Sequence, residues 1–464
     1  MASSFRMGSA FPIVIAACAM IACSAGSGGT GAGPDNNTGG SGGGGASQGG
    51  NGGAPGSGGV PSDGGTSSQF MTGPGGAPPT NNCDGEGPDY DQDGFTVEEG
   101  DCNDCDPNAN PGAIEVIGEA PTGEGGGSGG EGGAGEYVPV DEDCDGTADN
   151  VAGPCDTNLP LAGTDPLDGA RAVEICKQAA TEKDWGIVSA QYVRGDGTPY
   201  AANQQVGILN TFGPNVMPRA GASMLALSSG YARLPGQAGA CTNHSCTVLG
   251  LSAPGYAPPD FPQDVPDCPI SDVVHDDIGL NLTLRAPTNA TGFKFNFKFH
   301  SFEFGEYVCT TFNDQFIALV NPAPPGSVNG NISFDAEGNP VSVNIAFFDV
   351  CASCSDFAQN CYDDPTAVPP VICPNPPANC CSAGAGELAG TGFENGFGDG
   401  EDAGGTSWLQ TQAPVTGGET FELRFAIWDV GDTAWDSTSI VDAFEWIANG
   451  GEVPVETTPA PPPM

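Results

Sequence analysis

Hydrophobic and polar residues alternate through much of the second half of the chain. In residues 293–300 every odd position is Phe, and the even positions are Lys, Asn, Lys and His. Because successive side chains of a strand point to opposite faces of a sheet, this pattern predicts a half-buried antiparallel strand. Phe302 and Phe304 continue the apolar pattern in the opposite phase, so we expect a β-bulge near His300 and Ser301.

Other segments show related strand patterns. Alternation recurs in residues 280–284, 341–345 and 421–427, and residues 316–320 form a continuous apolar run. The continuous run predicts a strand that is more deeply buried than the alternating ones. These short strands, separated by Gly and Pro turns, predict an antiparallel β-fold.

One helix is expected before the strands. Asp165 is a suitable N-cap and Pro166 a suitable first helical residue, and Val173, Cys176 and Ala180 would share one face of the helix. Residues 157–449, about 290 in all, are enough to bury a substantial core. We therefore predict a large jelly-roll-like β-sandwich with one N-terminal helix.

The amino-acid composition separates this domain from its flanks. Residues 24–82 are almost entirely Gly, Ser, Ala, Pro, Thr and Asn, which cannot bury enough apolar surface to order the chain. We expect a disordered tether of 59 residues with a root-mean-square reach of ~40–45 Å. Residues 450–464 are expected to be a disordered Pro-rich tail.

Residues 1–23 have the pattern of an export signal. Arg6 precedes an apolar run over residues 10–22, which is too short to span a bilayer. The run ends at Cys23 in a sequence that resembles a bacterial lipobox, with Met20 where Leu is usual. The resemblance implies that Cys23 is lipidated and that the protein is anchored in the outer membrane or at the cell surface of a Gram-negative bacterium. The alternative is an ordinary secretory signal, with Cys23 as a disulfide partner.

The charge of the chain narrows the possible partners. There are 58 acidic and 11 basic residues, which gives a net charge of −47. Such a chain repels phosphate backbones, so we expect no nucleic-acid partner. Carboxylates attract hard cations such as Ca²⁺.

The acidic residues are most concentrated in residues 83–156, which hold 21 Asp or Glu and no Lys or Arg. Asp89, Asp91 and Asp93 occupy positions 1, 3 and 5 of a loop with Gly at position 6, and Phe95 can offer its carbonyl at position 7. This is the beginning of an EF-hand-like Ca²⁺ loop. Position 12 is Gly100, so Glu98, Glu99 or Asp101 would have to complete the site.

Two further acidic and Cys-bearing clusters follow, at residues 100–115 and 141–149. Together with residues 89–95, they resemble the MopE-type metal-binding repeat of bacterial surface proteins. This sequence departs from the repeat by lacking a Cys after Glu115 and by a Gly-rich insert over residues 118–135. The resemblance implies a small irregular metal-binding module, and its carboxylates suit Ca²⁺ better than a soft metal. A disordered acidic spacer is the alternative. The candidate metal ligands here are Asp89, Asp91, Asp93, Phe95, Asp101, Asp104, Asp106, Asp141, Asp143, Asp145 and Asp149.

The predicted sandwich has its own resemblance. Residues 185–190, 224–230, 302–314 and 429–446 are similar, in order, to the choice-of-anchor L domain of bacterial surface proteins. The resemblance implies surface attachment and no known activity. Two acidic groups lie in these motifs, and for both the alternatives are Ca²⁺ binding and turn capping, with capping favoured for the second. The first group is Asp429, Asp432, Asp436 and Asp442; the second is Glu303, Glu306, Asn313 and Asp314.

The 18 cysteines indicate an oxidising compartment. The segments Cys241–Cys246, which includes His244, and Cys351–Cys354 are reminiscent of zinc sites, but no second C-x-x-C completes one, so disulfides are favoured. The disulfide candidates are Cys83, Cys102, Cys105, Cys144, Cys155, Cys176, Cys241, Cys246, Cys268, Cys309, Cys351, Cys354, Cys361, Cys373, Cys380 and Cys381.

Motifs of common enzyme classes are absent from the sequence. There is no H-E-x-x-H, G-x-S-x-G, Walker loop or dinucleotide fingerprint. We therefore predict a non-enzymatic, lipid-anchored, calcium-binding surface protein whose sandwich binds an extracellular glycan or protein. The alternative is a surface hydrolase that acts on polysaccharide or peptide through sandwich carboxylates, with His275 beside Asp276 and Asp277 as one candidate group.

Overall fold

The computed structural model divides the chain into two units, Met1–Gly76 and Ala77–Met464. The predicted signal peptide, lipidation site and tether lie outside the described residues. Within the described residues, no helix is long and apolar enough to cross a membrane. The described residues are 83, 87–117, 139–240, 255–266, 268–304, 307–334, 338–343, 350–351, 384–394, 403–448 and 451–462.

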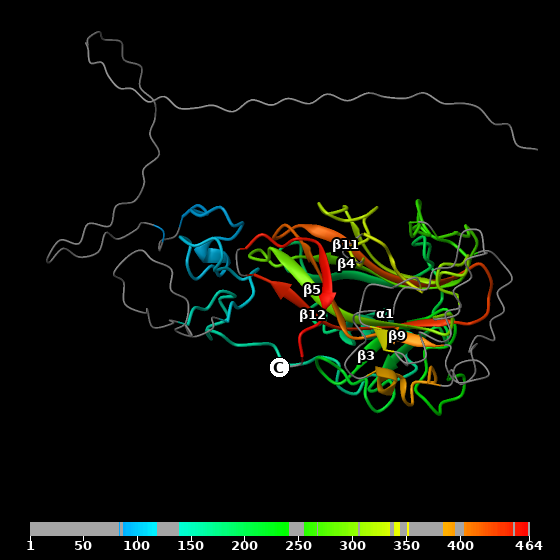
Figure 1. Cartoon of the computed structure of the whole chain (residues 1–464). Helices are drawn as coiled ribbons and strands as arrows, with labels where there is room; N and C mark the ends of the chain where they lie inside the picture. Colours follow the sequence, from blue (N-terminus) through cyan, green and yellow to red (C-terminus); the bar gives the residue numbers. More distant parts are fainter. Residues whose placement is uncertain are drawn as a thin grey trace, which may run out of the picture. The chain divides into compact units, whose positions relative to one another are not determined.

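Two antiparallel sheets form the main body of the second unit (Figure 1). The first sheet has the strand order β1 (Gly186–Val193), β4 (Val274–Arg285), β11 (Thr420–Val430), β6 (Gln315–Asn321) and β7 (Val341–Ser342). The second has the order β13 (Glu456–Pro459), β10 (Leu409–Pro414), β5 (Gly292–Ser301), β12 (Ser437–Ile447), β3 (Met224–Ser228) and β2 (Val206–Leu209), with β9 (Gly404–Thr406) paired to β5 and β8 (Val350–Cys351) paired to β9. The predicted mainly β, two-sheet fold is confirmed.

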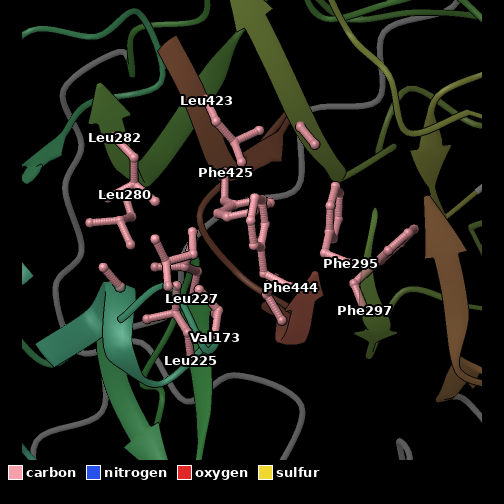
Figure 2. Close-up of a cluster of buried hydrophobic side chains, with 14 of the residues drawn as sticks. Val173, Leu225, Leu227, Leu280, Leu282, Phe295, Phe297, Leu423, Phe425 and Phe444 are labelled. Atoms are coloured by element: carbon pink, nitrogen blue, oxygen red, sulfur yellow. The ribbon is translucent and has the colours of Figure 1, made fainter. Parts of the chain in front are cut away.

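The core lies between the sheets, where the alternating Phe residues of β5 meet the alternating apolar residues of β11. The ring of Phe295 meets that of Phe425 edge-on, with centroids 5.0 Å apart. Figure 2 shows these rings in one buried cluster with Leu280 of β4 and Leu227 of β3. All four side chains are buried, so the period-2 pattern of the sequence builds the core as expected.

The polar face of β5 is buried from Asn296 onward, which corrects the half-buried strand that the sequence predicts, while Lys294 stays partly exposed. Lys298 is fully buried, and its Nζ lies 2.8 Å from Glu387 Oε1. His300 is also fully buried, against Phe212 and Phe393. The covering residues come from segments distant in sequence, including the short 3₁₀ helix η2 (Gly384–Leu388).

The bulge expected near His300 and Ser301 is not formed. Both residues keep their register with Thr438 and Ser437 of β12, and β5 ends at Ser301. The change of hydrophobic phase therefore reflects the end of the strand. The register of this pair shifts instead within β12, between Asp442 and Glu445.

The predicted helix begins where expected. Asp165 caps α1 (Pro166–Arg171) by accepting a hydrogen bond from the Leu167 amide at 3.0 Å. The helix ends after six residues, however, and does not extend to Ala180. The following residues instead pair with β1, since the Ile187 amide donates to the carbonyl of Lys177.

The C-terminal residues also differ from expectation. Residues 451–462 are described and contain β13, which pairs with β10. The hydroxyls of Thr457 and Thr411 lie 2.7 Å apart in this pair. The hydrogen bonds of this ladder order four residues of the tail, which the composition had predicted to be disordered. Of the strand expected at 341–345, residues 341–342 form β7, and 344–349 lie outside the described residues.

Candidate metal centre

The loop formed by residues 89–95 is shaped by its first aspartate. Asp89 accepts hydrogen bonds from the amides of Gln92 at 2.6 Å and Gly94 at 3.0 Å. Gln92 and Gly94 both have left-handed backbones, with φ of 66° and 99°. Glycine is favoured at such an angle because it has no Cβ. The loop therefore turns back on itself and directs its alternate carboxylates to one side, as its spacing predicts.

Carboxylates from this loop meet two more from the next turn of chain. Oxygens of Asp91, Asp93 and Asp101 lie within 4.8 Å of one another. A second group, formed by Asp89, Asp91 and Asp104, meets the same limit. Asp91 belongs to both groups, so five carboxylates surround one small region. We call these five residues, Asp89, Asp91, Asp93, Asp101 and Asp104, the first cluster.

The hydrogen bonds of the first cluster leave one side of it open to a cation. In Asp91, Asp93, Asp101 and Asp104, Oδ1 accepts a bond from a backbone amide, at distances between 2.7 and 3.2 Å. In the same four residues Oδ2 is buried and receives no hydrogen bond of good geometry from the described residues. The Asn110 side chain interacts with the Asp93 carboxylate. An orphaned buried oxygen is costly, and four close together indicate a site built for a positive ligand.

Electrostatics supports the same view. Burial raises the pKa of Asp93 to about 6, and the neighbouring charges of Asp91 and Asp101 add to that shift. Burial also raises the pKa values of Asp91 and Asp101, again with help from nearby carboxylates. A bound cation would relieve this repulsion and favour the ionised form.

The sequence did not decide which of Glu98, Glu99 and Asp101 completes the loop. The structure brings Asp101 into the cluster, and Asp104 joins it. Glu99 instead forms an ion pair of 2.6 Å with Lys183, which precedes β1. The short 3₁₀ helix η1 (Val97–Glu99) turns the chain so that Asp101, not position 12, returns to the loop.

Residues 141–147 repeat the conformation of residues 89–95. The amide of Gly146 donates to Asp141 Oδ2 at 2.9 Å, as Gly94 does to Asp89. Cys144 and Gly146 have φ of 57° and 95°, matching the two left-handed positions of the first loop. The sequence shows this repeat as a second D-x-D-x-D-G, at residues 141–146.

A second carboxylate cluster forms beside the second loop. Oxygens of Glu115, Asp141 and Asp143 lie within 4.8 Å of one another. Glu115 accepts bonds from the amides of Asp143 at 3.4 Å and Asp149 at 2.6 Å. Glu115 was not among the ligands predicted from the sequence. Its place in the resembled repeat was the signal that could have identified it as one.

Other predicted ligands have different surroundings. Asp106 accepts bonds from the backbone and side chain of Asn108, as a turn-capping residue does. Asp145 accepts from the Thr147 amide and from Asn150. The Phe95 side chain is buried under Lys183, whose Nζ lies 4.9 Å from the ring centroid.

Disulfides hold the acidic module together. Cys102–Cys144 joins the segments that carry the two clusters, and Cys83–Cys105 closes the first of them. Cys155–Cys176 and Cys268–Cys309 lie farther along the chain. Because Cys155 and Cys176 are bonded to each other, their proximity to Glu174 is no thiolate metal site. The candidates at 241, 246, 354, 361, 373, 380 and 381 lie outside the described residues, as does the side chain of Cys351.

In the sandwich, the two acidic groups of the sequence are rearranged. Asp429 and Asp436 lie near each other and are joined by Asp314 and Glu303, while Asp432 is exposed. Asp442 is elsewhere, accepting bonds from the amides of Arg219 and Ala220. Glu306 lies outside the described residues.

The histidine group considered for a hydrolase is also divided. Asp277 forms an ion pair of 3.0 Å with Arg194 and accepts a bond from the Gly195 amide. His275 instead lies opposite Asp429 in the ladder between β4 and β11. The Asp277 carboxylate is therefore already engaged in a structural pair.

Comparison with known proteins identifies one region of the chain. Residues 282–443 match the family model of the Choice-of-anchor L domain. The matched segment runs from β4 to β12 and so contains strands of both sheets. This match supports a surface-associated protein. Neither the curated proteins nor the solved structures gave a match to the chain.

Proposed function

We propose that this protein binds Ca²⁺ in its acidic module and adheres, through the Choice-of-anchor L domain, to an extracellular glycan or protein, while Cys23 anchors it to the membrane by lipid. The observation that carries the metal proposal is the set of four buried, unpartnered Oδ2 atoms in Asp91, Asp93, Asp101 and Asp104.

The chemistry of the donors favours Ca²⁺ over other metals. All ligand candidates in the first cluster are oxygens, which hard cations prefer. They come from the loop and from the turn of chain that follows it, and the two groups share Asp91. Ca²⁺ tolerates such irregular, crowded coordination better than Mg²⁺ does. The five described cysteines of the module, at 83, 102, 105, 144 and 155, are held in disulfides.

A structural role for the ion follows from the small core of the module. In the described part of residues 83–156, the buried hydrophobic residues are Phe95, Ala109 and Ala113. Three such side chains cannot offset the entropy of ordering the segment. Disulfides and bound Ca²⁺ would supply the missing stabilisation, as in other small domains with little core.

The surface role rests on the domain match and on the sequence. The match supports surface association, and the lipobox-like Cys23 with the Gly-rich tether suits a domain displayed away from the membrane. In this proposal the ion keeps the acidic module folded between tether and sandwich.

The metal proposal is tested by calorimetry and proteolysis of the full chain with its disulfides intact. We expect heat on titration with Ca²⁺, and cleavage of residues 83–156 only after EDTA treatment. The double variant D91N/D93N should weaken binding at least about tenfold. D106N is the matched control, because Asp106 caps a turn outside the cluster. Equal protease resistance with and without Ca²⁺ would contradict the proposal.

A further inference from the structure

The inward-facing rows of the sandwich turn from apolar to acidic at one end of the core. On β11 the buried row Leu423, Phe425 and Ile427 continues to Asp429. On β5 the row of alternating Phe residues continues, two positions after Phe299, to Ser301. Because the period of a strand is two, Asp429 and Ser301 face the space between the sheets. Glu303 follows the end of β5, and its buried carboxyl group interacts with Asp314.

The neighbouring strands contribute polar residues to the same end. Asp314 precedes Phe316 by two positions and is fully buried. Ser437 and Ser229 continue the inward rows of β12 and β3. Ser437 Oγ donates to Asp314 Oδ2 at 2.7 Å, which joins the two sheets across the core. The hydrophobic core therefore ends in a polar layer, not in solvent.

Asp314 is the central carboxyl group of this layer. Asp314 contacts both Asp429 and Glu303, and the Asp436 carboxylate adds its charge near Asp429. Asp429 is 1% exposed and Glu303 is 2% exposed. The Ser229 hydroxyl interacts with Asp429, but neither oxygen of Asp429, nor Oε2 of Glu303, receives a hydrogen bond of good geometry from the described residues. Buried oxygens of this kind lack the water or donors that normally solvate them.

Among the described residues, no Lys or Arg forms an ion pair with Glu303, Asp314 or Asp429. Ten of the eleven basic residues lie beyond residue 156, all within the described ranges, and each makes its contacts elsewhere. Their partners are Asp168 for Arg171, Trp185 for Lys177, Glu99 for Lys183, Asp277 for Arg194, Pro461 for Arg219, Val206 for Arg233, Thr181 for Arg285, Glu445 for Lys294, Glu387 for Lys298 and Asn281 for Arg424.

We propose that Glu303, Asp314 and Asp429, with Asp436 beside them, bind a second hard divalent cation of the Ca²⁺ class at this end of the sandwich. The site is separate from the acidic module and joins β5, β6, β11 and β12. Ser437 holds Asp314 in place through its hydroxyl, and the Val430 amide donates to the other Asp314 oxygen at 2.9 Å. The ion would fasten the two sheets at the point where apolar packing ends.

The electrostatic cost of the layer without an ion is consistent with this site. Burial and the charge of Asp314 raise the pKa values of Glu303 and Asp429 well above their usual range. The protein alone therefore does not stabilise the ionised carboxylates, and a divalent cation would do so.

The experiment uses the full chain carrying D91N/D93N, so that the first cluster no longer contributes. Tb³⁺ is titrated as the probe, with emission excited at a wavelength that tryptophan absorbs and tyrosine does not. Trp428 and Trp435 are sequence neighbours of Asp429 and Asp436, whereas the first cluster has Tyr90 beside it. We expect tryptophan-sensitised emission that Ca²⁺ displaces, and at least a tenfold loss of Tb³⁺ affinity in D429N and in E303Q.

Thermal unfolding of the same variants separates a metal site from a proton-sharing network. Without divalent ions, D429N should raise the melting temperature, because it removes the cost of burying an ionisable carboxyl group beside other carboxyl groups. With Ca²⁺, D429N should melt lower than its parent, because it loses the ion. D442N is the control, since Asp442 is buried on β12 but outside the layer, and its Ca²⁺ response should match the parent. The proposal is overturned if D429N shifts the melting temperature equally with and without Ca²⁺, or if the parent gives no sensitised emission. Either result leaves the acidic-module proposal unaffected. If D429N does not fold, E303Q decides by the same criteria.

Discussion

Thr288 Oγ1 donates a hydrogen bond of 2.8 Å to Asn110 Oδ1, and this contact links the sandwich to the acidic module. Thr288 lies in the turn between β4 and β5, while Asn110 is fully buried in the module and interacts with Asp93 of the first cluster. The Thr288 amide also donates to the Gly112 carbonyl at 2.9 Å. One buried side chain therefore contacts both the candidate metal site and the end of the sandwich.

Asn289→Ala should loosen the module without unfolding the sandwich. The Asn289 side chain accepts from the Ile114 amide at 3.0 Å and donates to the Ile114 carbonyl at 2.8 Å. Loss of both bonds should cost about 1–3 kcal/mol of local stability. We expect faster hydrogen exchange across residues 110–116 with Ca²⁺ present. Asn321→Ala, which loses one exposed bond to Glu422, should leave that exchange unchanged.

Gly94→Ala should weaken Ca²⁺ binding through the backbone alone. A Cβ at Gly94 would have no atom within 4 Å, so crowding is not the cause. The cost is the left-handed φ of 99°, which L-residues other than glycine adopt at about 1–2 kcal/mol. Calorimetry should show a roughly 5- to 30-fold loss of affinity at the first cluster. Gly153→Ala is the control, because Gly153 also has open space but is not left-handed. Equal affinities in the two variants would contradict this account.

The sequence was most informative where a local period determines structure. The alternating Phe residues of 293–299 predicted β5, and the spacing of Asp89, Asp91 and Asp93 predicted their convergence. It was least informative where the partner is distant. Lys298 appeared solvent-facing because Glu387, 89 residues away, is invisible to a local pattern.

The same distinction explains the acidic groups of the sandwich. Asp314 and Asp429 are separated by more than 100 residues, and only the pairing of β6 with β11 brings them together. Asp429 and Asp442 are close in sequence, yet they lie apart because β12 carries Asp442 away from its start. Grouping by sequence distance therefore kept Asp429 with Asp436 but wrongly added Asp442, and it separated Asp429 from Asp314.

Glu174→Gln should change how stability depends on pH. Burial, with the charge of Asp156, raises the pKa of Glu174 from 4.5 to about 7. The folded state thus favours the protonated form, and protonation of Glu174 stabilises the fold. This stabilisation is fully present below pH 4.5 and is lost as the pH rises to about 7. Because the side chain is partly exposed, we expect an effect on the order of 1 kcal/mol. Melting temperatures between pH 5 and 8 should fall less in the variant than in the parent, and parallel pH profiles would contradict this.

Lys298 and Glu387 form an ion pair. The effects of substituting its two members on the free energy of unfolding should be strongly non-additive. Lys298 is fully buried, and Glu387 Oε1 lies 2.8 Å from its Nζ. In Glu387→Leu the ammonium keeps its burial but loses its carboxylate, which should cost on the order of 3 kcal/mol.

The double variant Lys298→Met/Glu387→Leu removes the buried charge together with its partner, so its stability should return to within about 1 kcal/mol of the parent. Urea unfolding of the parent, both single variants and the double variant measures the coupling. The pair of Lys294 on β5 with the exposed Glu445 on β12 is the matched control and should show a coupling below about 1 kcal/mol. Additive losses at Lys298 and Glu387 would mean that water reaches the ammonium, and that the polar face of β5 is not sealed by the segment carrying Glu387.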